Sequence, residues 1–233
     1  MKVNFQILIG MCTKAHRGCK MRNLKKTAWV VVCILTVGLL WGCTSDADMK
    51  AYLQALLDTS YKNDTTTFVK IKLGTADEAK TLYEQGIDTG VSSFCSRLGV
   101  SEDYKDEFRQ LYMDMLKMVR YQVGDAQKQS DGSYIVTVSY EKMNIFKPTL
   151  ELYQQNVAAL ANVWMTNTDN PPSEEEKMKE VVLQFKKSME TVLAEVQYNE
   201  AETMTIRIEL VDKLYTPNTD DVAQLEKVLF DGE

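Results

Sequence analysis

The sequence predicts an α+β fold in which a small antiparallel sheet packs against several helices. Most of the chain carries apolar residues at helical spacing. Two segments change to the alternating pattern of strands: 121–140, interrupted by Ser130-Asp131-Gly132, and 204–210. Because few long crossovers join these strands, an antiparallel sheet made of a hairpin and a C-terminal strand is expected, with helices on one face.

The stretch from residue 46 to residue 119 predicts three helices. The first spans 46–61. The second begins after Thr75, a suitable N-cap, because Glu78 three residues later completes a capping box. The third begins at Ser101 and keeps an apolar face to Val119. Between the first two, the segment 68–73 alternates too briefly for a strand and is predicted to be irregular.

Two glycines interrupt the apolar stripe of the second helix. Gly86 and Gly90 each cost about 1 kcal/mol relative to alanine inside a helix, so the fold must compensate for them. Close approach of a neighbouring helix is one explanation, and room for a ligand is the other.

The predicted hairpin has one apolar and one half-exposed face. Tyr134, Val136, Val138 and Tyr140 share the apolar face, because side chains alternate along a strand. The last strand, 204–210, has the same alternation with a polar outer face, and Pro217-Asn218-Thr219 is expected to end it. A short final helix follows.

Two further helices between the hairpin and the last strand are predicted to pair. One restarts at Pro148, and the other is capped by Ser173 with Glu176 at the third position. A loop rich in Asn, Asp and Pro joins them. The expected buried side of the first comprises Leu150, Tyr153, Val157, Leu160, Ala161 and Trp164. That of the second comprises Met178, Val181, Val182, Phe185, Met189, Val192, Leu193 and Val196.

The segment 21–43 has the organisation of an export signal. Arg22, Lys25 and Lys26 form a basic head, and the run 28–41 is uncharged and mostly apolar. The ending Leu40-Trp41-Gly42-Cys43 resembles the lipobox of bacterial lipoproteins, with Leu40 at −3 and Gly42 at −1. Trp41 departs from the small residue usual at −2.

The lipobox resemblance implies a lipid anchor on Cys43. Signal peptidase would recognise Leu40 and Gly42 and cut before Cys43, whose sulfur would carry a diacylglyceryl group with palmitate-type chains. Two acyl chains hold a protein stably to a membrane, whereas one does so marginally. The alternative is an uncleaved spanning anchor, because the 19 residues 27–45 contain no charge. In both cases the basic head places the remaining chain on the outer face of the cell membrane.

This interpretation divides the chain into four parts. Residues 1–20 are predicted to be a start-site extension, since Met21 begins a signal of ordinary length. Residues 21–42 are the signal peptide, 43–48 a tether, and 49–233 a single α+β extracytoplasmic domain.

Composition excludes several classes of function. Cleavage before Cys43 removes 7 of the 27 basic residues and no acidic ones, which leaves 20 basic against 33 acidic residues and a net charge of −13. That charge argues against a nucleic-acid partner and against a polybasic contact with anionic lipid. Cleavage before Cys43 also removes His16, the only histidine, and every cysteine except Cys43 and Cys95. An intramolecular disulfide, zinc sites that need histidine and Ser-His-Asp catalysis are therefore not expected.

No catalytic, cofactor-binding or metal-binding site emerges from the remaining residues. The acidic run 174–176 lies in the first turn of a helix, where the dipole already favours carboxylates, and it lacks the alternating ligands of a calcium loop. Cys95 is expected to be an inert buried thiol. Tyr121, Tyr134 and Tyr140 are the aromatic candidates for a pocket if the sheet lines one.

The span 49–140 resembles a family of uncharacterised Gram-positive lipoproteins that carry a domain of unknown function. The resemblance is carried by Tyr52-Leu53-Gln54-Ala55-Leu56-Leu57-Asp58, Tyr61-Lys62-Asn63-Asp64, Gly74-Thr75 with Glu78-Ala79, Tyr121-Gln122-Val123 and Asp131-Gly132-Ser133-Tyr134. It covers about half of the chain that follows the signal. It implies a cone fold of the nuclear-transport-factor or cystatin-like kind, and it transfers no activity or site.

These observations favour a non-enzymatic lipoprotein that binds a ligand or acts as a scaffold in the envelope. Its partners would be the membrane, through Cys43, and an unidentified small molecule or envelope protein. Two alternatives remain open. One is a carboxylate-dependent hydrolase of envelope material, which a buried Asp or Glu in a deep pocket would favour. The other is a protein–protein interaction module, which an exposed apolar patch would favour.

Overall fold

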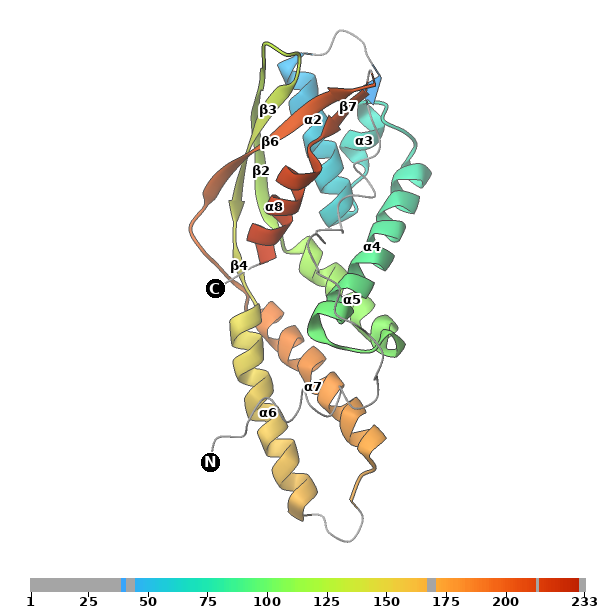
Figure 1. Cartoon of the computed structure of the whole chain (residues 1–233), viewed down its shortest axis with the longest axis vertical. Coiled ribbons are helices and arrows are strands. Elements are labelled where there is room, and N and C mark those ends of the chain that lie inside the picture. The colour runs from blue at the N-terminus through green and yellow to red at the C-terminus, as the bar shows by residue number, and fades with distance from the viewer. Residues whose placement is uncertain (1–38, 41–44, 167–170, 213, 231–233) are drawn as a thin grey trace, which may run out of the picture.

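A computed structural model describes residues 39–40, 45–166, 171–212 and 214–230 of the chain. The molecule is elongated, with a sheet and most of the helices at one end and a helical hairpin extending from the other (Figure 1). The expected α+β class is confirmed. Apart from Leu39 and Leu40, the predicted signal segment lies outside the described residues, as do the cleavage-site residues Gly42 and Cys43 and the proposed start-site extension.

Helices make up most of the described structure. They are α2 (Asp46–Leu57), its π-helical continuation η1 (Asp58–Lys62), α3 (Thr66–Lys70), α4 (Ala76–Leu98), the short 3-10 helix η2 (Glu102–Tyr104), α5 (Lys105–Lys117), α6 (Phe146–Thr166), α7 (Glu174–Ala194) and α8 (Thr219–Phe230). The strands are β1 (Leu39–Leu40), β2 (Arg120–Lys128), β3 (Tyr134–Glu141), β4 (Met143–Asn144), β5 (Gln197–Tyr198), β6 (Glu202–Val211) and β7 (Leu214–Pro217).

The main sheet is antiparallel and has the strand order β1-β7-β6-β3-β2. The predicted hairpin is confirmed as β2–β3, whose turn contains Gly132 at a φ of 87°, a value that glycine adopts without strain. The predicted C-terminal strand is β6. Pro217 was expected to end this strand. Instead, the chain turns at Asp212 and returns as β7, and Pro217 is the last residue of β7.

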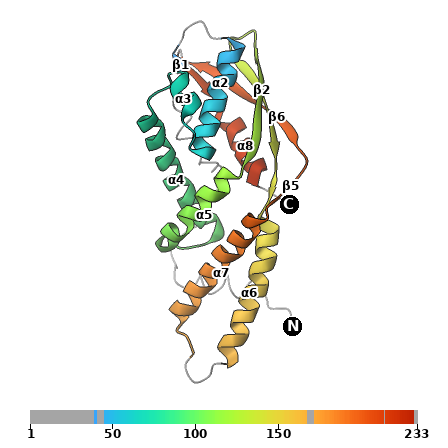
Figure 2. The ribbon, with the colours of Figure 1, turned by 180° about the vertical axis from the view of Figure 1, so that it is seen from behind.

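The alternation predicted for the hairpin matches the burial of its side chains. Tyr134, Val136, Val138 and Tyr140 are buried, whereas Thr137 is exposed. Ile206 and Ile208 of β6 extend the same buried face. The helices lie on this side of the sheet in both views (Figures 1 and 2). The other face of the sheet stays open to solvent.

Helix α2 fills the space between the sheet and the outer helices. Six of its twelve residues are fully buried: Met49, Tyr52, Leu53, Ala55, Leu56 and Leu57. The Tyr52 hydroxyl donates a hydrogen bond of 2.9 Å to the carbonyl oxygen of Tyr215 and so joins α2 to β7. Burial on most sides explains the density of large apolar residues in this segment.

The helix starts follow local signals. Thr75 and Glu78 form the predicted capping box of α4, and Ser173 and Glu176 form that of α7. The segment 68–73 was predicted to be irregular, but its first three residues belong to the short helix α3. Burial of Phe68 holds this helix against the core. Tertiary packing therefore decided a structure that the local pattern left open.

Gly90 lies where α4 and α5 cross. A Cβ atom on Gly90 would be 2.5 Å from the Tyr112 hydroxyl oxygen and 2.8 Å from two ring carbons of the same residue. Because Tyr112 is buried, its ring has little room to retreat. Close approach of a neighbouring helix, the first of the two explanations considered, therefore accounts for this glycine.

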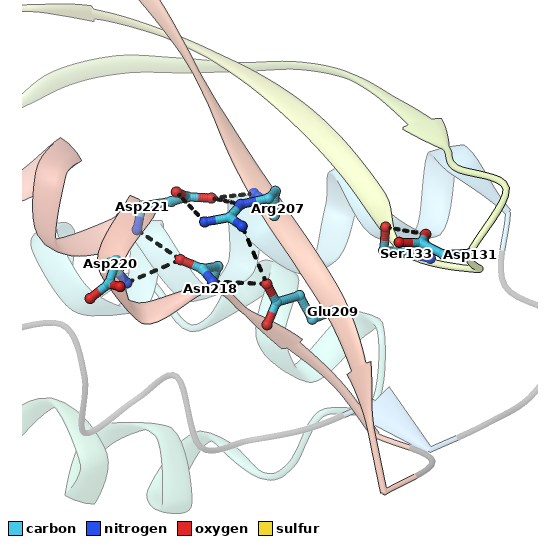
Figure 3. Close-up of polar contacts among 7 residues, drawn as sticks. All are labelled: Asp131, Ser133, Arg207, Glu209, Asn218, Asp220 and Asp221. Carbon is cyan, nitrogen blue, oxygen red and sulfur yellow. Dashed lines mark hydrogen bonds and ion pairs between the residues drawn. The ribbon is translucent and has the colours of Figure 1, made fainter.

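A polar cluster attaches the start of α8 to β6, as Figure 3 shows. Strand β6 extends beyond its partner β7, so the backbone of Arg207 would lack hydrogen-bond partners on that side. The Asn218 backbone N–H donates to the Arg207 carbonyl oxygen over 2.7 Å, and the Arg207 backbone N–H donates to the Asp221 carboxylate over 3.0 Å. The end of the strand is thereby closed by the first turn of the helix.

Side chains strengthen the same connection. The Arg207 guanidinium donates two hydrogen bonds to Asp221, of 2.8 Å and 3.0 Å. The Asn218 side chain accepts from the backbone N–H groups of Asp220 and Asp221 and donates to Glu209. Partial burial raises the pKa of Asp221, but the hydrogen bonds and charge of Arg207 outweigh it, so the pKa lies below its ordinary value of 3.8.

We expect Asp221→Asn to lower the free energy of unfolding by about 1–2 kcal/mol at neutral pH, because it weakens charge-assisted hydrogen bonds. A lowered folded-state pKa means that the carboxylate stabilises the fold above the ordinary pKa of 3.8 and loses this effect as pH falls through its lower folded value. Urea unfolding of the unaltered protein and of Asp221→Asn should therefore show free energies of unfolding that differ by a constant amount above about pH 5. The difference should narrow at lower pH.

The matched control is Asp220→Asn, which removes a neighbouring charge from the same helix turn but whose side chain makes none of these hydrogen bonds. Equal losses in the two variants would show that the helix dipole, and not the bond to Arg207, is responsible.

Candidate functional site

The folded domain begins two residues after the predicted lipidation site. Ser45 is the N-cap of α2, and its side chain accepts a hydrogen bond from the backbone N–H of Asp48. Asp48 in turn accepts hydrogen bonds of 2.8 Å from both the backbone N–H and the hydroxyl of Ser45, and these lower its pKa. Regular structure starts at Asp46, so residues 46–48 of the expected tether belong to α2.

The N-terminus of α2, β1, the β6–β7 turn and α3 lie together at one end of the molecule, which we call the α2 end (Figures 1 and 2). Leu40, the predicted −3 residue of the cleavage site, belongs to β1 and is paired with Leu214 of β7. The α2 end exposes three aliphatic side chains, with exposed fractions of 42% for Val69, 38% for Leu210 and 50% for Val211.

The opposite end consists of the antiparallel pair α6 and α7, which we call the hairpin arm (Figure 1). The predicted pairing of these helices is confirmed. The predicted burial of α6 is not, because Thr149 is its only fully buried residue and Leu150 is 41% exposed. The reason is thickness: α7 alone packs along most of α6, so two helices cannot enclose a complete core.

The surface of the hairpin arm is unusually apolar along α6. The fifteen residues 152–166 contain no charged side chain. Val163 and Met165 near the far end are 59% and 68% exposed. On α7, Met178 and Leu183 are each 37% exposed. Exposed apolar groups gathered on one element are typical of a surface that contacts another molecule.

The three tyrosines predicted to line a pocket are each engaged in packing or hydrogen bonding. Tyr134 is fully buried, with its ring edge against Tyr215 at a centroid distance of 5.6 Å. The Tyr140 hydroxyl donates to Glu202 over 3.1 Å. Tyr121 lies directly across the sheet from Tyr140, so the structure brings these two side by side, while Tyr134 sits at the other end of β3.

Tyr121 closes a polar contact that sequence spacing does not reveal. Its hydroxyl donates a 2.5 Å hydrogen bond to Asp58 in η1, and burial together with this carboxylate raises its pKa. Lys62 lies 3.4 Å from the same carboxylate and 4.3 Å from the centre of the Tyr121 ring. The contact holds the π-helical turn against β2, and a π turn is itself often found beside functional sites.

Behind this turn lies a group of buried tyrosine hydroxyls. Burial first, and then the nearby charge of Glu226, raise the pKa values of Tyr61 and Tyr112. Within the described part of the chain, the hydroxyls of Tyr61 and Tyr83 are buried without a hydrogen-bond partner. Such groups destabilise a fold, because each loses its hydrogen bonds to water on burial.

One groove of about 470 Å³ opens between α3 and α4. Its walls are Phe68, Leu73, Asp77, Glu78, Thr81, Leu82 and Gln85. None of the three candidate tyrosines contributes to it. Glu78 on its wall already accepts hydrogen bonds from the backbone N–H and the hydroxyl of Thr75.

The described residues contain no group of three or more His, Cys, Asp or Glu side chains arranged to hold a metal ion. Among the helices described, none is long and apolar enough to cross a membrane. Cys95 is buried, as expected, and burial raises the pKa of its thiol.

Comparison with known proteins supports the fold. No family model and no curated protein sequence matches the chain. The structure is similar to the crystal structure of YcdA, described as a candidate lipoprotein from Bacillus subtilis subsp. subtilis strain 168, with a TM-score of 0.54 and 16% sequence identity. The likeness covers 81% of this chain and 56% of that chain, so this chain spans little more than half the length of that protein. At this identity the comparison shows a shared α+β fold.

We expect two buried tyrosines to respond oppositely to loss of their hydroxyl groups. Tyr52→Phe removes the hydrogen bond to the Tyr215 carbonyl and should lower the free energy of unfolding by about 1–2 kcal/mol. Tyr61→Phe removes a hydroxyl without a partner among the described residues and should leave stability unchanged or raise it. Urea unfolding of the two variants measures both effects.

Tyr61→Phe and Tyr52→Phe are matched changes, since Tyr61 and Tyr52 are both fully buried. A loss in Tyr61→Phe as large as that in Tyr52→Phe would contradict the assignment and would indicate that a bound water or ligand uses the Tyr61 hydroxyl.

Proposed function

We propose that the protein is a lipid-anchored, extracytoplasmic envelope protein without enzymatic activity, which holds or organises a partner by means of the hairpin arm. The observation that carries the proposal is the arrangement of its two ends. The helix that follows Cys43 almost directly starts at one end, and the exposed apolar surface of α6 lies at the other.

Three features support the anchor. The segment 40–43 resembles a lipobox, the chain resembles uncharacterised Gram-positive lipoproteins, and a protein of similar fold is described as a candidate lipoprotein. Cleavage before Cys43 would also remove Leu39 and Leu40 and would leave β7 as the outer strand of the sheet. Because β7 has only four residues and ends in Pro217, it offers little edge for pairing with another chain.

The hairpin arm supports a binding or scaffold role. Its exposed Val163 and Met165 lie on an uncharged stretch of helix in a strongly acidic protein. An apolar helical partner surface could approach this stretch without the charge repulsion that it would meet elsewhere. The proposed partner is therefore another envelope protein that packs against α6.

Cys43→Ser tests the anchor. The variant should be released from the membrane fraction or should accumulate as unprocessed precursor, because a serine hydroxyl does not replace the acylated sulfur. Metabolic labelling with radioactive fatty acid and separation of membranes from soluble protein measure both properties. Cys95→Ser is the matched control and should be labelled and processed normally, since Cys95 is buried. Normal labelling of Cys43→Ser would refute the anchor.

A photocrosslinking amino acid at Val163 tests the hairpin arm. In intact cells it should yield one discrete crosslinked product, because Val163 is exposed on the uncharged surface. The same amino acid at Lys187, an exposed position on α7, should yield little or none. The identity of the product is then checked by its loss when Val163 and Met165 are replaced by glutamate. Equal products from both positions would argue against a specific surface on α6.

A further inference from the structure

The length of chain between the lipid and the folded domain limits how far the domain can stand from the membrane. Ser45 is fixed by its capping box at the first turn of α2. Two peptide units separate it from Cys43, and they span at most about 7 Å when fully extended. This inference rests on the lipid anchor proposed above. With so short a connection, the α2 end must lie close to the lipid headgroups.

The α2 end carries a second group of exposed aliphatic side chains, separate from the group on the hairpin arm. Val211 is opposite Leu214 in the β6–β7 pair. The turn that displays Leu210 and Val211 lies at the same end of the molecule as the N-terminus of α2, which follows Cys43 (Figures 1 and 2). Helix α3, which carries Val69, lies at this end in both views (Figures 1 and 2).

Charge at this end is mixed. Lys70 and Lys72 are exposed beside Val69, and both would favour an anionic membrane surface. Asp212 in the β6–β7 turn, and Asp46 and Asp48 in the first turn of α2, are exposed or nearly so and would oppose it. Attraction between charges does not explain the surface, so contact with lipid must depend on the aliphatic side chains.

We propose that the α2 end rests directly on the bilayer, with Val69, Leu210 and Val211 in the headgroup region and the hairpin arm pointing away from the membrane. The acyl chains supply most of the affinity, and the three side chains fix the orientation of the domain. The partner of this surface is a lipid bilayer, and the partner of the hairpin arm is presented at a distance from it. Helix α6 alone adds roughly 30 Å of length in that direction.

Tryptophan fluorescence tests this orientation, because Trp164 is the only tryptophan after Cys43 and belongs to the hairpin arm. The mature lipidated protein is reconstituted into phosphatidylcholine vesicles whose acyl chains carry bromine near the headgroups. Val211→Trp, in a Trp164→Phe background, should lose at least about half of its fluorescence compared with unbrominated vesicles, since a contact residue lies within the boundary region. Trp164 in the unaltered protein should lose little.

Two further variants complete the design. Val69→Trp, in the same background, probes the second element of the surface and is quenched as well if the surface lies on lipid. Leu183→Trp, again with Trp164→Phe, is the matched control, because Leu183 is an exposed aliphatic residue of the hairpin arm. Circular dichroism confirms that each variant is folded before its quenching is compared.

The outcomes separate the orientation from the anchor. Failure of the protein to float with the vesicles would refute the lipid anchor itself. If the protein floats but Val211→Trp or Val69→Trp is not quenched, the proposed orientation is refuted and the anchor is left intact. Strong quenching of Trp164 or of Leu183→Trp would also overturn the proposal, because it would place the hairpin arm on the membrane.

Discussion

Burial of α2 between the sheet and the outer helices is the constraint on which the rest of the structure depends. Its residues pack against β2, β3 and α3, the Tyr52 hydroxyl bonds to β7, and six of its twelve residues are fully buried. Because α2 starts immediately after the predicted lipidation site, any force on the lipid would act directly on the core. A flexible linker would have separated the two.

The two ends of the molecule differ in how they are stabilised. The sheet and its helices enclose a conventional core, closed at the β6 edge by Arg207 and Asp221. The hairpin arm has a core only one layer deep, built from residues such as Val182, Phe185 and Met189 on the inner side of α7. It therefore leaves apolar surface exposed that a thicker domain would cover. Exposure there is a consequence of shape and is also what makes the arm suitable for contact with another protein.

The sequence predicted what depends on neighbours along the chain and failed where partners are distant. Both predicted capping boxes formed, because Thr75 and Glu78, for example, are three residues apart. The strand β7 was missed because its pairing with β6 depends on tertiary contact and it ends in Pro217. The periodicity of α6 identified an apolar face, but a periodic pattern does not show how many other elements pack against that face. Likewise, nothing near Tyr121 in the sequence indicates Asp58, which lies 63 residues away.

Net charge determines which kind of membrane contact such a domain can make. In the proposed mature form, with a net charge of −13, the domain would be repelled by anionic lipid, and the exposed Lys70 and Lys72 would not offset that repulsion alone. A short connection to the proposed acyl chains would bring the domain to the membrane surface in spite of its charge, and aliphatic contacts are insensitive to the sign of the lipid headgroup. The same repulsion would turn the acidic remainder of the domain away from the bilayer. The proposed anchor, the proposed apolar contact and the charge therefore favour one orientation, in which the uncharged length of α6 would be held away from the membrane.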